Sequence, residues 1–183
     1  MEKSLISLCL LSGLSIGNCF AQVPAKPNIL LIVADDCSYY DIGCFGAVNN
    51  KTPNIDALAR QGIKFNCAYN SVTRHCLYTG MFPMHHGGYA NHSSVNADVK
   101  SLPSYLGELG YRVGLSGKWH IKPLANFPFE DVPGFPKGCT STNTDYTTDG
   151  IKEFMGRNNS QPFCLVLASI NPHAPWTGGD ASV

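Results

Sequence analysis

The sequence is poor in charge: only 14% of its 183 residues are Asp, Glu, Lys or Arg, and 13 basic residues balance 13 acidic ones. A chain without net charge gives no electrostatic reason to expect nucleic acid or an acidic membrane surface as its partner. It has eight cysteines but no C-x-x-C pair and no Cys/His zinc pattern. After residue 21 no apolar run is long enough to span a bilayer. The length suffices for one hydrophobic core, which predicts a single domain.

Residues 1–21 have the pattern of a secretory signal peptide. Lys3 gives a positive start, residues 5–16 form a short apolar run, and the segment closes with a small residue, Ala21. We therefore expect an exported protein, periplasmic or secreted, that begins with a Pro-containing lead-in at residues 22–27. The six later cysteines would then lie in a compartment that permits disulfides, but their pairing cannot be read from the sequence.

The segment at residues 28–36, N-I-L-L-I-V-A-D-D, is a short apolar run that ends in two carboxylates, Asp35 and Asp36. Such a run predicts a strand buried on both faces, as in the centre of a parallel sheet. Ligands of open α/β sheets bind beyond the carboxyl ends of these strands. Two adjacent carboxylates repel each other unless a cation lies between them, which a divalent metal could supply. The alternative is that they cap a turn or the next helix.

The rest of the chain alternates between helical and strand patterns. Apolar residues at helical spacing predict helices at 53–61, 102–109 and 146–157. Continuous apolar runs predict strands at 111–116 and 163–169, and a looser alternation suggests a short strand at 63–69. This alternation predicts an α/β fold with a mainly parallel sheet.

Polar residues follow three of the predicted strands. Asp35 and Asp36 follow the first, Lys118 and His120 the second, and His173 the last. Because the carboxyl ends of parallel strands meet at one edge of a sheet, we expect these side chains to share one crevice.

A series of motifs in this order resembles the sulfatase family of the alkaline-phosphatase-like superfamily. They are P-N-I-L-L-I-V-A-D-D at 27–36, T-P-N-I-D-A-L-A-R-Q-G-I-K-F at 52–65, A-Y-N-S at 68–71, L-Y-T-G-M-F-P at 77–83, L-P-S-Y-L-G-E-L-G-Y-R at 102–112, G-K-W-H at 117–120 and N-P-H-A-P-W at 171–176. The G-K-W-H-I-K-P run, with F-P-F-E after it, is more loosely similar to the heparan N-sulfatase branch. The resemblance implies a three-layer α/β/α fold of the alkaline-phosphatase-like type, truncated on its C-terminal side. Residues 28–183 would be the N-terminal part of a sulfatase catalytic domain.

The resemblance also implies roles for individual residues. Arg74 matches the arginine that closes the family's C-x-P-S-R signature, and Lys118 matches a lysine that binds a sulfate oxygen. His120 matches a histidine near the nucleophile, and His173 one that binds the sulfate or protonates the leaving oxygen. These roles suit a sulfate monoester, because cations offset the charge on its leaving oxygen and a histidine can supply a proton near neutral pH.

Asp35 and Asp36 match the first two metal ligands of the family, usually for Ca²⁺, with Mg²⁺ as the alternative. Two carboxylates are too few for Ca²⁺, which takes about six to eight oxygen ligands. The remaining ligands of the family would lie beyond Val183. The same shortness predicts an unpaired sheet edge and uncovered apolar surface.

The sequence departs from the family at the nucleophile. The family converts the first residue of a C/S-x-P/A-S-R signature to formylglycine, but no Cys or Ser of this chain begins that pattern. In register with Thr79-Gly80, Asn70 stands in the nucleophile position, and a short stretch is missing before Arg74. Cys76 lies on the wrong side of Arg74, so we expect a packed cysteine there. The chain as given is therefore predicted to be inactive.

These observations predict a sulfatase-like hydrolase of sulfate esters or N-sulfates, with a sulfated small molecule or glycan as its partner. One alternative is a non-catalytic, sulfatase-like binding protein, and another is a gene-model fragment that does not fold alone. A third is a phosphodiesterase or phosphonate hydrolase of the same superfamily, since a metal and a cationic clamp also suit phosphoryl groups.

Overall fold

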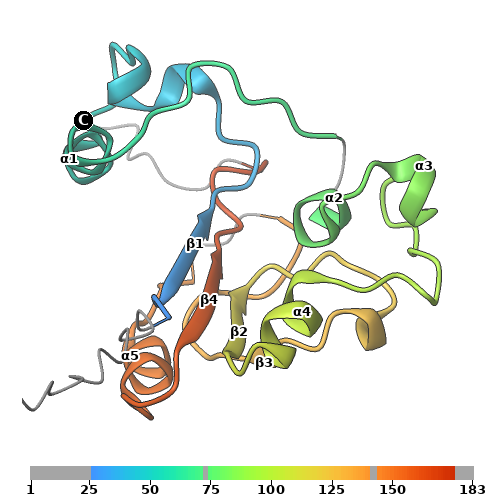
Figure 1. Ribbon diagram of the computed structural model, residues 1–183. Helices are drawn as coiled ribbons and strands as arrows, with labels where there is room; N and C mark the ends of the chain where they lie inside the picture. Colours follow the sequence, from blue (N-terminus) through green and yellow to red (C-terminus); the bar gives the residue numbers. More distant parts are fainter. Residues whose placement is uncertain (1–25, 72–73, 141–143, 176–183) are drawn as a thin grey trace, which may run out of the picture.

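A four-stranded parallel sheet forms the centre of the computed structural model, which describes residues 26–71, 74–140 and 144–175 (Figure 1). The signal peptide predicted at 1–21 lies outside these residues, as does most of the lead-in. The strands are β1 (Ile29–Val33), β2 (Arg112–Gly117), β3 (Glu130–Asp131) and β4 (Phe163–Ala168). Their order is β1-β4-β2-β3, and every neighbouring pair is parallel. The three longer strands confirm the predictions from the apolar runs.

The strand register aligns the carboxyl ends of the three longer strands. Ala168 of β4 lies opposite Val33 of β1 on one side and opposite Gly117 of β2 on the other. The segments that follow these strands therefore leave the sheet at the same edge, as the sequence predicted.

Helices cover both faces of the sheet, which confirms the predicted three-layer α/β/α arrangement (Figure 1). On one face α2 (Arg74–Thr79) and α4 (Leu102–Glu108) pack against β2 and β4, with Tyr78 and Leu106 among the contacting side chains. On the other face α5 (Asp149–Gly156) contributes Ile151 and Phe154 to a second core.

The remaining elements lie in the connections. They are two 3₁₀ turns, η1 (Tyr39–Asp41) and η2 (Gly43–Phe45), the helices α1 (Pro53–Gln61) and α3 (Pro83–His86), and a further turn, η3 (Leu124–Asn126). Helix α1 confirms its prediction and lies apart from the sheet with η1 and η2 (Figure 1). The strand suggested at 63–69 is absent from this described segment, so that prediction is wrong.

Strand β1 corrects a second prediction. The sequence predicted a central strand buried on both faces, but β1 is an edge strand, and Ile32 is 62% exposed. Only Leu31 and Val33 pack against the core, because β4 is the one strand of the described chain that pairs with β1. The apolar run predicted that β1 is buried, but the described residues leave part of this strand without packing partners.

Two further observations bear on the sequence predictions. No helix in the described part of the chain is long and apolar enough to cross a membrane. No disulfide joins the six cysteines within the described ranges.

Candidate active site

The carboxyl ends of the strands border one pocket of about 340 Å³. It is lined by Asp35, Asp36, Arg74, His75, Asn91, His92, Lys118, His120 and His173. All six residues singled out from the sequence are in this set, so the structure brings them together. The sequence did not single out His75, Asn91 and His92. The only available signal was the high histidine content of residues 81–95.

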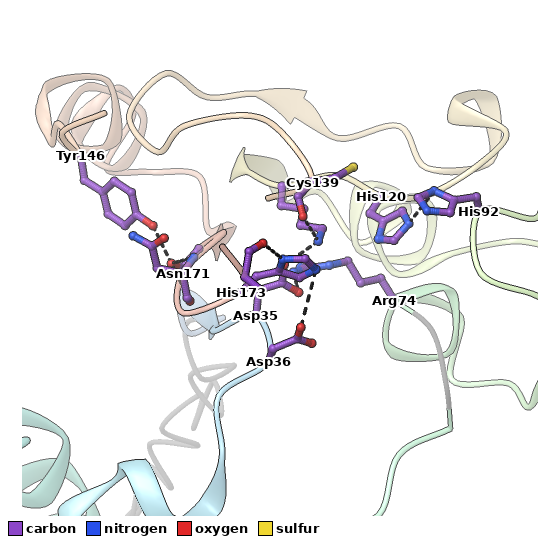
Figure 2. Close-up of polar contacts among 12 residues, drawn as sticks. Asp35, Asp36, Arg74, His92, His120, Cys139, Tyr146, Asn171 and His173 are labelled. Atoms are coloured by element: carbon purple, nitrogen blue, oxygen red, sulfur yellow. Dashed lines mark hydrogen bonds and ion pairs between the residues drawn. The ribbon is translucent and has the colours of Figure 1, made fainter. Parts of the chain in front are cut away.

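Asp35 is held between two cations. Its Oδ1 accepts a hydrogen bond from Arg74 Nη2 at 3.0 Å, and its Oδ2 accepts one from Lys118 Nζ at 2.5 Å (Figure 2). The Lys118 side chain is only 3% exposed, and its Nζ also donates to the Cys139 carbonyl at 2.9 Å. A buried ammonium group needs such partners, because an unpaired charge away from water is strongly destabilising. Asp35 therefore fixes Lys118 and Arg74 at the wall of the pocket.

Asp36 points to a different partner, although it is adjacent to Asp35 in sequence. Its φ of +57° turns the chain, and its Oδ2 lies 3.6 Å from His173 Nε2 (Figure 2). His173 Nδ1 lies 2.5 Å from the Ala174 carbonyl oxygen, so Nδ1 carries the proton. The pair becomes an ion pair when Nε2 is also protonated.

The described residues do not fit a calcium site on their own. No group of three or more Asp, Glu, His or Cys side chains within the described ranges is arranged to hold a metal. Both oxygens of Asp35 already face cationic groups, which compete with a metal for the same lone pairs. Two carboxylates that diverge in this way leave most of the roughly six to eight ligands of Ca²⁺ unsupplied.

His120 forms a pair with His92 in the same pocket. His120 Nε2 lies 3.0 Å from His92 Nδ1, and the two ring centroids are 4.5 Å apart (Figure 2). Burial lowers the pKa of His120, and the positive charges of Lys118 and Arg74 lower it further. Neutral imidazole is therefore the favoured form of His120 near neutral pH.

Cys76, two residues after Arg74 on helix α2, is not among the residues that line this pocket. Cys76 is buried, as predicted, and its Sγ lies 3.2 Å from His86 Nε2. Cys76 lines a neighbouring pocket together with Asn70, the residue in the nucleophile register. Among the described residues, those that line the pocket include no cysteine, serine or threonine.

The model of the sulfatase family matches residues 27–181 of this chain. The chain belongs to the sulfatase family. It is 36% identical over 168 residues to an ulvan-active sulfatase of Formosa agariphila. The aligned region covers 85% of this chain and 32% of that protein. It is 34% identical over 167 residues to human N-sulphoglucosamine sulphohydrolase. The aligned region covers 81% of this chain and 32% of the human protein. The predicted sulfatase resemblance, including its looser match to the heparan N-sulfatase branch, is confirmed.

A solved structure has the same fold. The structure of BT4656 with its substrate, D-glucosamine-2-N,6-O-disulfate, matches with a TM-score of 0.69 and 27% identity, covering 83% of this chain and 36% of that one. The predicted alkaline-phosphatase-like fold class is thereby confirmed. This sulfatase-family chain spans about a third of the length of the curated relatives named above.

Proposed function

We propose that this chain binds the sulfate group of a sulfated glycan in the strand-end pocket and does not hydrolyse it. The observation that supports binding is the convergence of Arg74, Lys118, His120 and His173 on one pocket. The observation that supports loss of hydrolysis is the missing C/S-x-P-S-R nucleophile. The glycan class follows from the similarity to an ulvan-active sulfatase and to BT4656.

Arg74 supplies one of the cations suited to an anionic ligand. Its Nη2 is used by Asp35, but its Nη1 is buried and has no hydrogen-bond partner among the described residues. The Tyr78 hydroxyl group, which is also buried, interacts with this guanidinium, and Arg74 lines the pocket. A sulfate oxygen suits this donor because Arg binds oxyanions through charge-assisted hydrogen bonds.

The net charge of the pocket depends on its histidines. The two carboxylates, Asp35 and Asp36, balance the charges of Arg74 and Lys118. Any net positive charge must therefore come from histidine protonation, and burial and the nearby cations oppose it at His120 by lowering its pKa. His173 and His120 are the groups we propose for contact with the ester and its bridging oxygen.

The role of Asp35 and Asp36 differs from that of a complete metal site. Asp35 and Asp36 occupy the positions of the family's first two ligands, but the described residues supply no others. In this chain we propose that their main role is to order Lys118, Arg74 and His173. Export is likewise proposed, from the signal-peptide pattern of residues 1–21.

The test combines a binding and a hydrolysis measurement on the purified 183-residue chain. Calorimetry with D-glucosamine-2-N,6-O-disulfate should show binding that the same sugar without sulfate groups does not show. Incubation with an aryl sulfate should release no sulfate. Replacing Lys118 by Met should weaken binding about 10- to 100-fold, as expected for a lost charge-assisted hydrogen bond. Lys152→Met, at an exposed lysine on α5, is the matched control and should bind normally.

Two results would contradict the proposal. No heat at millimolar disulfate would show that the pocket does not bind sulfate groups. Release of sulfate from the aryl ester would show that a nucleophile is present after all. Circular dichroism of Lys118→Met separates a lost contact from a lost fold, since Lys118 is buried and paired with Asp35.

A further inference from the structure

His92 lies in the pocket with an unusual backbone conformation. Three non-glycine residues of the described chain have positive φ: Asp36 at 57°, His92 at 62° and His120 at 47°. All three line the strand-end pocket. Such conformations are costly for residues with a Cβ atom and tend to cluster at functional sites. Neither the family motifs nor the position after a strand gave His92 a role, so its presence in this set needs an explanation.

The His92 ring is directed at one nitrogen of His120. The two residues come from different connections, His92 from the segment between α3 and α4 and His120 from the segment after β2 (Figure 2). The contact joins His92 Nδ1 to His120 Nε2 at 3.0 Å. With Nε2 engaged in this way, Nδ1 is the His120 nitrogen that remains for a ligand.

The chemistry of an anionic ligand then determines the direction of the hydrogen bond. A sulfate oxygen can only accept, so Nδ1 of His120 must carry a proton to bind it. A neutral imidazole has one N–H, and Nε2 of His120 must therefore be an acceptor. The donor to that acceptor is His92, through its Nδ1–H.

We propose that His92 is a positioning residue that sets the proton of His120, so that His120 offers Nδ1–H to an anionic ligand. This inference rests on the proposed sulfate-binding function, because the anion is what requires the donor. The surroundings agree with the assignment. Lys118 and Arg74 face His120 with positive charge and Asp35 with negative charge, while His92 is exposed to solvent.

The test uses histidine side-chain ¹⁵N NMR, which distinguishes the two tautomers, together with calorimetry. In the wild-type chain with D-glucosamine-2-N,6-O-disulfate, His120 should be the Nδ1–H tautomer. His92→Gly removes the ring at a residue whose φ of +62° glycine tolerates, so it avoids the added strain of alanine. It should shift His120 toward the Nε2–H tautomer and weaken binding up to about tenfold.

Two further variants make the result specific. His92→Asn tolerates the same backbone conformation and can donate from its amide to Nε2 of His120, so it should restore both the tautomer and the affinity. His85→Ala changes an exposed histidine of α3 that does not line the pocket, and should alter neither.

The outcomes separate the two proposals. Normal binding by the wild type with a His120 spectrum that does not respond to His92→Gly would overturn the role of His92 and leave sulfate binding intact. An Nε2–H tautomer of His120 in the wild-type complex would do the same. Absence of binding by the wild type would overturn the proposed function and this inference with it.

Discussion

At the scale of single residues, two buried histidines limit the pH range in which the fold is stable. His75 and His86 are 2% and 0% exposed. Nε2 of His75 accepts a hydrogen bond from the Lys122 N–H, and Nδ1 of His86 accepts one from the Gly88 N–H, each at 3.0 Å. Burial lowers the pKa of both rings. For His75, the neighbouring His86 lowers it further.

We expect the free energy of unfolding to decrease as the pH falls below 6.5, the ordinary histidine pKa. The unfolded chain takes up protons there, whereas the folded rings resist protonation until a lower pH, so the stability is complete above this range and is lost below it. The slope is at most about 1.4 kcal/mol per pH unit for each histidine. Urea denaturation between about pH 7.5 and about pH 5.5, a range above that in which carboxylates titrate, measures this slope.

The exposed neighbour of His86 provides the control. His85→Ala should leave the pH dependence unchanged, because His85 is solvent-exposed in both states. Equal stability across the window would contradict the argument from burial.

The sequence predicted the pocket residues well but not their pairing. Asp35, Lys118 and His173 could be placed together because each follows a strand of a parallel sheet. Adjacent residues can point in different directions, so the sequence could not show that Asp35 binds cations while Asp36 faces His173. The contact of His92 with His120 depends on the path of a long connection, which no local pattern encodes.

At the scale of the elements, the apolar runs predicted which segments form strands but not where each strand lies in the sheet. The composition of β1 predicted burial on two faces, but the described chain provides few side chains to cover one side of this strand. Residues 63–69 alternate in polarity, yet no strand of the described chain pairs with them, and Ile63 and Phe65 are exposed. Helix α2, six residues long, is too short for a helical period to appear in the sequence.

The end of β2 gives a prediction about one glycine. Gly117 has a φ of +102°, and a Cβ atom there would lie 2.1 Å from the Ala168 carbonyl oxygen. The N–H of Lys118 donates to the same oxygen at 2.9 Å. Gly117→Ala must therefore strain the strand end and displace Lys118 from Asp35. We expect a loss of about 2 kcal/mol or more in the free energy of unfolding, together with weaker sulfate binding.

Gly107 of α4 is the matched control, because a Cβ atom there meets nothing within 4 Å. Gly107→Ala should raise stability by about 0.5–1 kcal/mol, since alanine is the better helix former. Urea denaturation of both variants measures the difference, and a loss of the same size in both would show that the contact with Ala168 does not matter.

At the scale of the whole molecule, apolar side chains are exposed in several places, two of which are β1 and the segment around α1. On β1, Leu30 and Ile32 face solvent at an unpaired sheet edge of the described chain. In the segment around α1, Ile63, Phe65 and Tyr69 are exposed. Monomeric soluble proteins rarely leave such surface uncovered, and an open edge strand is a template for association.

We expect the 183-residue chain to self-associate and to bind an apolar dye. An uncharged dye such as Nile red is the appropriate probe, because a sulfonated dye would compete for the anion pocket. Light scattering should show species larger than the monomer. Ile32→Lys places a charge on the 62% exposed edge residue of β1 and should reduce both association and dye binding without changing the circular dichroism.

Leu124→Lys tests whether any exposed leucine would behave in the same way. Leu124 is 59% exposed on η3, outside the two apolar regions, so its replacement should leave association and dye binding unchanged. A monodisperse wild-type monomer with little dye fluorescence would contradict the prediction. If the chain does associate, Ile32→Lys becomes the background in which sulfate affinities are measured, because a monomer is needed to assign one ligand to one pocket.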